Sequence, residues 1–162
     1  MSAIVVKDIV DEDFINYKRP SMFIATSRCS FKCEKESGVR CCQNSALAQA
    51  KSIEIDDDEI ITRYMQNHIT SAIVFGGLEP FDQFEELYHF ISQLRHFHKC
   101  DETVVIYTGY NEIEVLFSIN QLSKFKNIII KFGRFIPNQE RHFDEVLGVY
   151  LASPNQYAKE IS

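Results

Sequence analysis

An alternation of short apolar runs with helix-like segments constrains the fold of this chain most. The apolar runs have the composition of buried strands; they are SMFIAT (21–26), SAIVF (71–75), TVVIYT (103–108), NIIIKF (127–132) and LGVYLA (147–152). Segments with helical character lie between several of them, at residues 55–68, 81–97 and 111–125. Strands that alternate with helices predict a mostly parallel sheet with right-handed crossovers. We therefore expect a single α/β domain over residues 1–162.

Helical periodicity is clearest in residues 81–97. Apolar residues recur there at spacings of three and four, which places them on one face of a helix; they are Phe84, Leu87, Tyr88, Ile91 and Leu94. In the segment 55–68, the aspartates at 56–58 favour the positive end of a helix dipole, and we expect their charges to be solvated. AIVVKDIV (3–10) is compatible with an extra edge strand, and SALAQA (45–50) with the start of a helix.

Composition and charge exclude several functions. The net charge is −6, the isoelectric point is near 5.4, and lysines and arginines are scattered singly. Nucleic acids are bound by concentrated basic surfaces, so we expect no nucleic-acid partner. No apolar run approaches the roughly 20 residues that span a bilayer, and the N-terminal segment soon becomes acidic, unlike a secretory signal. We expect no membrane association and a cytoplasmic location.

Four of the five cysteines lie in one short segment, CSFKCEKESGVRCC (29–42), which follows the first expected strand. Its polar residues and Gly38 predict a loop. Disulfides, a zinc site, an iron–sulfur cluster and simple packing are the possible roles of these cysteines. Thiols stay reduced in the cytoplasm, where clustered cysteines bind metal more often than they pair, and the polar surroundings disfavour packing.

The cysteine spacing favours a cluster over zinc. Structural zinc sites commonly use two Cys-x2-Cys pairs, whereas here a Cys-x3-Cys pair is followed by the adjacent Cys41 and Cys42. Neighbouring side chains in an extended segment point to opposite sides, so Cys41 and Cys42 are poorly placed to bind the same ion. Cys29, Cys33 and one of the later pair fit a [4Fe–4S] cluster that leaves one iron open. A zinc site remains the alternative.

Two further loops follow predicted strands, FGGLEPFD (75–82) and YTGY (107–110). The carboxyl ends of parallel strands meet at one edge of a sheet, so these loops and the cysteine loop form the candidate site. Gly76 and Gly77 allow close approach of the backbone to a ligand, and Glu79 is suited to an ammonium group. The alternative is a turn in which the following proline starts the next helix.

These motifs together resemble the radical S-adenosylmethionine superfamily. The likeness lies in Cys29-x3-Cys33 after a first strand, a third cysteine, and a Gly-Gly-Glu-Pro-like turn after a second strand. The chain is more similar to one branch, the activating proteins of anaerobic ribonucleotide reductases. These often have Asn shortly after the third cysteine, as Asn44 is here, and a Thr-Gly-Tyr turn, as at 108–110.

Two weaker likenesses lie near the C-terminus, namely KFGRF (131–135) and Ser-Pro-Asn-Gln (153–156). The resemblance covers roughly residues 8–161. In this chain eight residues separate Cys33 from Cys42 where the family usually has two, and we expect the extra segment 34–40 to bulge away from the cluster.

The resemblance implies a small partial (βα) barrel of mostly parallel strands with outer helices. It also implies a [4Fe–4S] cluster held by Cys29, Cys33 and Cys42, with Cys41 as the alternative third ligand. The open iron would bind the amino and carboxylate groups of S-adenosylmethionine. We choose Cys42 because Gln43-Asn44 follows it.

The resemblance further implies residues that bind this cofactor. Gly76, Gly77 and Glu79 would receive the methionine ammonium, and Thr108 and Gly109 would also contact the cofactor. Leu78 stands between the glycines and Glu79, which leaves open whether the carboxylate or only backbone carbonyls face the ammonium.

The implied reaction is reductive cleavage of S-adenosylmethionine to methionine and a 5′-deoxyadenosyl radical. The radical would take a hydrogen from a glycine of the partner enzyme, an anaerobic ribonucleotide reductase, and a donor such as flavodoxin would supply the electron. No catalytic side chain beyond the cluster and cofactor is expected. The alternatives are a radical enzyme acting on a small molecule and a non-catalytic module that binds zinc or a cluster.

Other chemically active residues have simpler explanations. Residues 96–100 include two histidines and Cys100, but their position at a helix end suits cationic side chains, and we expect Cys100 to be a free thiol. Lys131, Arg134 and Arg141 could contact adenosine or an acidic partner, although isolated charges of this kind are expected at the surface.

Overall fold

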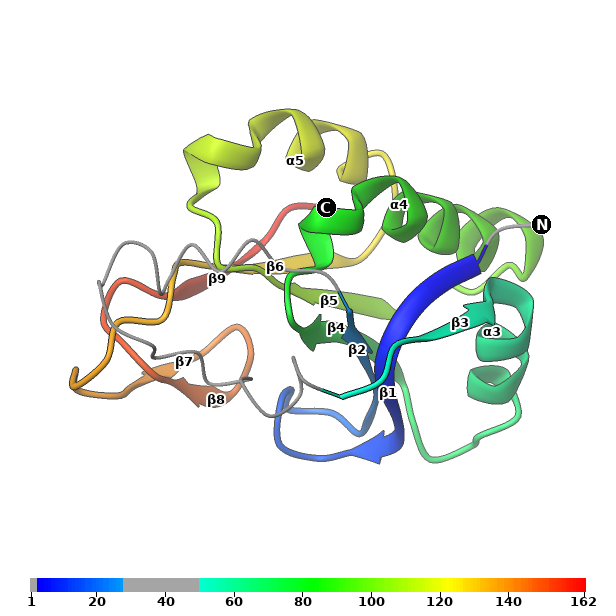
Figure 1. Cartoon of the computed structure of the whole chain (residues 1–162), viewed down its shortest axis with the longest axis horizontal. Coiled ribbons are helices and arrows are strands. Elements are labelled where there is room, and N and C mark those ends of the chain that lie inside the picture. Colours follow the sequence, from blue (N-terminus) through cyan, green and yellow to red (C-terminus); the bar gives the residue numbers. More distant parts are fainter. Residues whose placement is uncertain (1–2, 28–49) are drawn as a thin grey trace.

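The computed structural model describes residues 3–27 and 50–162. These residues form a seven-stranded sheet of order β3-β1-β2-β4-β5-β6-β9 and a separate β7-β8 hairpin (Figure 1). The strands are β1 (Ala3–Asp13), β2 (Ser21–Thr26), β3 (Ile53–Asp56), β4 (Ala72–Gly77), β5 (Thr103–Tyr107), β6 (Ile128–Phe132), β7 (His142–Asp144), β8 (Val149–Leu151) and β9 (Tyr157–Glu160). The helical segments are α3 (Asp57–Met65), the 3-10 turn η1 (Pro80–Gln83), α4 (Phe84–Ser92), the π-helical turn η2 (Gln93–Phe97), the 3-10 turn η3 (Glu112–Val115) and α5 (Leu116–Leu122).

The centre of the sheet is parallel, as the sequence predicts. β2, β4, β5 and β6 are neighbours in that order and all run in the same direction. Each crossover therefore moves the chain one strand further the same way, and right-handed crossovers of this kind put their helices on one face. Figure 1 shows α4 and α5 on one side of the sheet and the β7-β8 hairpin on the other.

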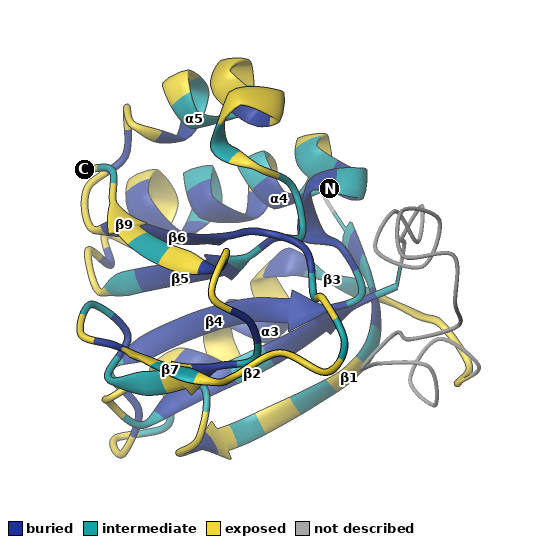
Figure 2. Cartoon of the chain, turned by 90° about the vertical axis from the view of Figure 1, so that its left-hand side faces the viewer, coloured by how far each residue is buried: buried dark blue, intermediate teal, exposed yellow. Residues whose placement is uncertain are grey.

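Alternate residues of the central strands build two cores. In β4, Ile73 and Phe75 pack under the helices, together with Leu87 and Phe90 of α4. The intervening residues, such as Val74, belong to a smaller cluster on the opposite face, which Leu147 and Leu151 cover. Both faces are thus buried, which explains why these strands are continuous apolar runs in the sequence (Figure 2).

Two strand predictions need correction, and one strand was not predicted. The segment 3–10 does form a strand, but β1 lies inside the sheet, antiparallel to both β2 and β3, and β3 is the edge. LGVYLA (147–152) contributes β8 to the hairpin, not a strand to the main sheet. The last strand of the sheet is β9, antiparallel to β6. Its sequence, YAKE, is largely exposed and polar and so carries no apolar signal.

The predicted partial barrel is not detected. In the described residues, β3 and β9 occupy the two ends of the strand order, so the sheet is open. The α/β class and the largely parallel centre are nevertheless as predicted. The expected helix start at 45–50 lies almost entirely outside the described residues, which resume at residue 50.

The start of α3 differs from the prediction of solvated charges. Asp56 caps the helix, because its carboxylate accepts a hydrogen bond from the Asp58 backbone N–H at 2.9 Å. Asp57 is only 2% exposed, and among the described residues neither of its carboxylate oxygens has a hydrogen-bond partner. Burial, with the charges of Asp56 and Asp58 adding to it, raises the pKa of Asp57 to about 7.

Asp57→Asn is therefore expected to stabilise the protein at about pH 8, by roughly 1–2 kcal/mol in urea unfolding. The folded state holds the Asp57 proton up to a pKa of about 7 whereas the unfolded chain releases it near 3.8, so wild-type stability falls as pH rises through this window. Asparagine does not titrate and avoids this loss. Glu59→Gln, at an exposed position of the same turn whose charge is not among those that shift the Asp57 pKa, is the control. An equal gain at about pH 4 and pH 8 would contradict the argument.

Candidate functional site

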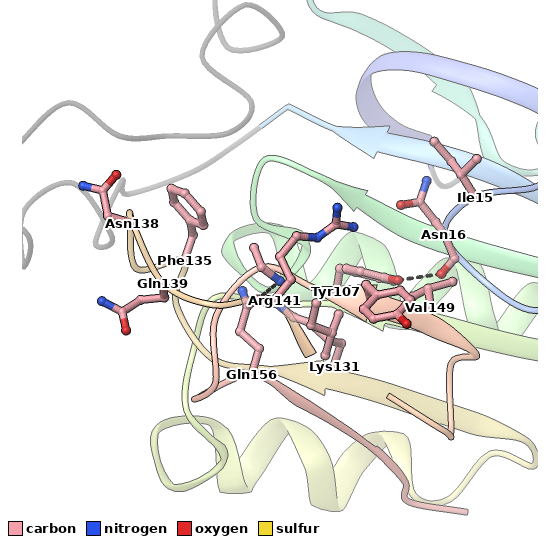
Figure 3. A pocket seen from close by; sticks show the side chains of 13 residues that line it. Ile15, Asn16, Tyr107, Lys131, Phe135, Asn138, Gln139, Arg141, Val149 and Gln156 are labelled. Carbon is pink, nitrogen blue, oxygen red and sulfur yellow. Dashed lines mark hydrogen bonds between the residues drawn. The ribbon is translucent and has the colours of Figure 1, made fainter. Parts of the chain in front are cut away.

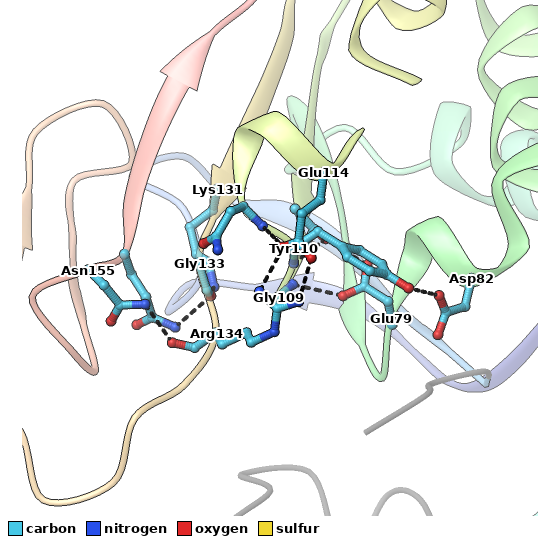
Figure 4. Close-up of polar contacts among 12 residues, drawn as sticks. Glu79, Asp82, Gly109, Tyr110, Glu114, Lys131, Gly133, Arg134 and Asn155 are labelled. Carbon is cyan, nitrogen blue, oxygen red and sulfur yellow. Dashed lines mark hydrogen bonds and ion pairs between the residues drawn. The ribbon is translucent and has the colours of Figure 1, made fainter. Parts of the chain in front are cut away.

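Two strand-end turns meet at the Glu79 carboxylate. β4 and β5 are parallel neighbours, so the turn after Gly77 and the turn after Tyr107 lie at the same edge of the sheet. Glu79 accepts hydrogen bonds from the Thr108 hydroxyl at 2.8 Å and from the Gly109 N–H at 2.7 Å (Figure 4). Three of the residues singled out from the sequence are thus in direct contact.

Local backbone geometry explains how Glu79 reaches this position. Leu78 continues the strand pairing, because its N–H donates to the Thr26 carbonyl at 3.2 Å. Glu79 is extended, and its carboxylate caps η1 by accepting from the Phe81 N–H at 3.0 Å. Pro80 begins η1, as the alternative interpretation of this turn predicts. The inserted Leu78 therefore does not carry the carboxylate away from the turn after β5.

Burial dominates the electrostatics of Glu79. The residue is 5% exposed, and desolvation raises its pKa to about 7 although the hydrogen bonds from Gly109, Phe81 and Thr108 act in the opposite direction. A carboxylate offers about four acceptor positions, and three of them are used here. Glu79 can therefore accept one further donor, and a cation in that place would favour its ionised form.

Gly76 and Gly77 are required by packing against β2. Gly77 has φ +78°, and a Cβ there would lie 2.7 Å from the Ala25 Cα. A Cβ on Gly76 would lie 2.9 Å from the Phe23 ring. The Gly76 carbonyl already accepts a hydrogen bond from the Thr26 hydroxyl at 2.9 Å. Close strand packing thus accounts for both glycines without a ligand, which the sequence alone could not indicate.

The Thr-Gly-Tyr turn is held from two sides. The Tyr110 hydroxyl donates to Asp82 at 2.6 Å. On the other side, the Arg134 guanidinium lies 5.9 Å from the centre of the Tyr110 ring and forms a two-pronged ion pair with Glu114, both contacts being 2.7 Å (Figure 4). The Gly133 N–H also donates to the Tyr110 carbonyl at 3.0 Å. This network fixes the turn that contacts Glu79.

The two C-terminal segments that weakly resemble the family, 131–135 and 153–156, contact each other. The Asn155 amide donates to the Arg134 carbonyl at 2.9 Å, and the Gln156 amide donates to the Gly133 carbonyl at 3.3 Å. Gly133 has φ +106°, and a Cβ there would lie 3.0 Å from the Asn155 carbonyl oxygen. The segment 153–156 therefore supports the loop that supplies Arg134.

Lys131, Arg134 and Arg141 were expected at the surface, and this prediction is wrong for the first two. Lys131 and Arg134 are each 6% exposed, whereas Arg141 is exposed. The Lys131 ammonium donates to the Gly133 carbonyl at 3.1 Å and lies 5.8 Å from the centre of the Tyr107 ring (Figure 3), and the Arg134 charge is paired with Glu114. Only the tertiary structure reveals such compensation.

The residues around Cys100 do not converge on a common point. The His98 ring nitrogen contacts Asp58 at 3.0 Å, and the His96 ring packs against Phe125. Cys100 is 5% exposed, and burial raises the pKa of its thiol. In the described part of the chain, no three His, Cys, Asp or Glu side chains are placed to share a metal ion.

The strand that precedes the cysteine segment ends at the same sheet edge as the turn that leads to Glu79. Cys29, Cys33, Cys41 and Cys42 lie outside the described residues, but β2 ends at Thr26, which is paired with Gly77. The chain thus enters this segment beside the turn that leads to Glu79. A parallel sheet whose carboxyl edge precedes a four-cysteine segment in the sequence is compatible with an α/β iron–sulfur protein.

The comparison with protein families agrees with this class. Residues 18–151, most of the chain, match the family of 4Fe-4S single cluster domains. The chain therefore belongs to this family and binds a [4Fe–4S] cluster. A comparison with curated proteins found no match. Within residues 3–27 and 50–162, no helix combines the length and apolar character that crossing a bilayer requires.

Proposed function

We propose that this protein uses its cluster to cleave S-adenosylmethionine and thereby installs a glycyl radical on an anaerobic ribonucleoside-triphosphate reductase. Cys29, Cys33 and Cys42 would hold the cluster, and a donor such as flavodoxin would reduce it. One observation carries the proposal. In a 4Fe-4S family member, the strand that precedes the cysteine segment ends at Thr26, directly beside the turn that leads to a buried carboxylate, Glu79.

Glu79 suits the ammonium group of the cofactor. Its remaining acceptor position lies on the oxygen that already binds the Gly109 N–H. An ammonium donor there would supply the positive charge that a buried carboxylate lacks, and the pKa of about 7 would then fall. Glu79 would thus orient the methionine end of the cofactor. When both are bound, the reduced cluster would supply the electron, and S-adenosylmethionine would supply the carbon–sulfur bond that is broken.

The Thr108–Gly109 turn holds the Glu79 carboxylate in position. Thr108 is 1% exposed and its hydroxyl both donates to Glu79 and accepts from the Tyr110 N–H at 3.0 Å. Because Arg134 and Asp82 hold Tyr110, the carboxylate has little freedom to rotate. Such rigidity favours binding of the cofactor in one orientation.

An exposed apolar patch beside this turn favours a protein substrate. Ile113, Leu116 and Phe117 are 78%, 57% and 72% exposed, and their spacing places them on one face of η3 and α5. They begin three residues after Tyr110. Contiguous exposed apolar side chains of this size mark protein-binding surfaces more often than isolated ones do. A docked partner would therefore lie next to the proposed radical site.

Replacing Leu116 and Phe117 together by Ser is expected to raise the KM for the reductase about tenfold or more. Cleavage of S-adenosylmethionine without the partner should stay unchanged, because neither side chain contacts Glu79 or the Thr108–Gly109 turn. Steady-state activation assays with varied reductase measure the effect. Phe97→Ser, at a 70% exposed position on η2, is the matched control. Equal KM values for both variants would argue against this docking surface.

Anaerobic reconstitution tests the function itself. The full chain is loaded with iron and sulfide, reduced with dithionite and mixed with S-adenosylmethionine, and 5′-deoxyadenosine is quantified. We expect product from the wild type and none from the variant with Cys29→Ala, Cys33→Ala and Cys42→Ala. Cys41→Ala should retain activity if Cys42 is the third ligand. A bound cluster without product would leave a non-catalytic module, and stoichiometric zinc would contradict the proposal altogether.

A further inference from the structure

The Gln83 side chain binds the backbone of β1. Gln83 is the last residue of η1 and is 2% exposed. Its amide nitrogen donates to the Val5 carbonyl at 2.9 Å, and its amide oxygen accepts from the Val5 N–H at 3.4 Å. One donor and one acceptor directed at the same residue reproduce the two hydrogen bonds that a residue of a neighbouring strand would make. Gln83 therefore pairs with β1 in place of a strand.

This contact lies where the pairing of β1 with β2 ends. The last antiparallel pair is Val6 with Thr26, so the next pair would be Val5 with Ser27. The N–H and C=O of one strand residue point to the same side, and Gln83 occupies both of these groups at Val5. The amide thus takes the position where β2 would continue, and β2 ends at Thr26.

The turn that carries Glu79 is attached to the sheet at both of its ends. At its start, the Leu78 N–H donates to the Thr26 carbonyl at 3.2 Å. At its end, Gln83 binds Val5, which belongs to the strand next to β2. Between these two attachments, the Glu79 carboxylate caps η1. The backbone of Glu79 is therefore fixed relative to the end of β2.

The second attachment lies at a bend of the chain. Gln83 has φ −132° and ψ 56°, which are not helical values, so η1 does not run into α4 as one continuous helix. The Gln83 side chain does not cap α4 and binds β1 instead. The start of α4 also lies close to β1 (Figure 1). The two hydrogen bonds to Val5 thus hold the chain at a point where helical hydrogen bonds do not.

We propose that Gln83 is a positioning residue for Glu79. By binding Val5, its amide holds the η1 turn against the sheet and keeps the Glu79 carboxylate against the turn at 108–109. The inference rests on the proposed function, because the carboxylate is held there for the ammonium group of S-adenosylmethionine. Gln83 binds β1 and acts on the cofactor only through Glu79. Its loss should therefore weaken cofactor binding more than it slows the chemical step.

Amide hydrogen exchange tests the attachment without the cofactor. The full chain is reconstituted with its cluster and measured by mass spectrometry in the absence of S-adenosylmethionine. Gln83→Met keeps a side chain of similar length and removes both hydrogen bonds. Exchange should rise about tenfold in the peptides that cover residues 3–7 and 79–84, because the Val5 N–H loses its acceptor and the η1 turn loosens.

Tyr64→Phe is the matched control. It removes another partly buried hydrogen bond, 2.7 Å long, which joins the Tyr64 hydroxyl on α3 to Glu102, and it leaves Gln83 intact. Exchange in the peptides 3–7 and 79–84 should then stay as in the wild type. The control therefore separates the attachment of the turn from a general loss of stability.

Binding of S-adenosylmethionine tests what the attachment serves. Equilibrium dialysis against the protein with its cluster oxidised measures Kd without turnover. Gln83→Met should raise Kd and KM about tenfold and change kcat less than about threefold, whereas Tyr64→Phe should leave Kd unchanged. Gln83→Asn keeps an amide on a side chain one methylene shorter and should give a smaller rise. This milder variant keeps the test decisive if Gln83→Met does not fold.

The two measurements fail in different ways. Unchanged exchange in Gln83→Met would show that Gln83 does not hold the turn. Raised exchange with an unchanged Kd, or a Kd raised equally in Tyr64→Phe, would show that the attachment does not serve Glu79, and each of these results would overturn the proposal. If the wild type does not bind S-adenosylmethionine, the proposed function fails and the role toward the cofactor fails with it. The exchange data need no cofactor, so they show which of the two inferences is wrong.

Discussion

Glu79→Gln is expected to slow the proposed cleavage of S-adenosylmethionine about a hundredfold and to change how stability depends on pH. Glutamine matches the carboxylate in size but offers one acceptor oxygen, so its NH2 group must face a donor, either the Gly109 N–H or the Phe81 N–H. It also has no charge to bind an ammonium. Loss of a charged hydrogen bond of about 2–3 kcal/mol corresponds to a rate effect of this size.

The pH dependence follows from the raised pKa of Glu79. Its pKa is about 7 in the folded protein against 4.5 for an ordinary glutamate, so between these values only the folded state holds the proton. Stability is highest below this window and falls as pH rises through it, by about 3 kcal/mol. Urea unfolding at about pH 5 and pH 8 measures the fall, which Glu79→Gln should largely remove.

Glu85→Gln is the control for this experiment. Glu85 is exposed on the first turn of α4, so its replacement should keep the wild-type pH dependence. Asp57 titrates in the same range but is present in all three proteins, so its effect cancels. An unchanged slope in Glu79→Gln would mean that Glu79 is ionised throughout, and the argument for a cation beside it would fail. Saturating S-adenosylmethionine should flatten the wild-type slope.

Arg134→Met is expected to lower the free energy of unfolding by about 3 kcal/mol. The substitution removes the cation from a largely buried ion pair and leaves the Glu114 carboxylate, whose side chain is 30% exposed, without that partner. It also removes the guanidinium from the Tyr110 ring. Urea unfolding at neutral pH measures the loss.

Two variants separate the ion pair from general packing. Arg134→Met combined with Glu114→Gln should recover part of the stability, because the carboxylate is then neutral. Arg141→Met, at an exposed arginine that also lies over a tyrosine ring, should cost less than about 1 kcal/mol. A loss of similar size in both single variants, or a fully additive double variant, would refute the role of the pair.

The parallel centre of the sheet could be predicted from the sequence. β2, β4, β5 and β6 are buried on both faces, and this burial requires continuous apolar residues that are visible in a single segment. The helical periodicity of residues 81–97 is equally local, and the structure places α4 there with Leu87 and Ile91 buried.

The outer strands could not be predicted in the same way. β3 and β9 pair on one side only, and each is four residues long and without a fully buried residue, so neither gives a continuous apolar run in the sequence. The position of β1 inside the sheet depends on pairing with two distant segments. Whether the sheet closes into a barrel or stays open likewise depends on how its edges are placed in space, and here they lie at opposite ends of the strand order.

The sequence by itself determined the class of this protein. Its cysteine segment, its apolar strands and the two turns that follow them are local patterns, and they suffice for an α/β domain with a [4Fe–4S] cluster. Only the tertiary structure decided that Glu79 binds the turn at Thr108 and that Lys131 and Arg134 are buried. These features depend on partners tens of residues away, because a charged side chain is buried only where the fold supplies the groups that compensate it.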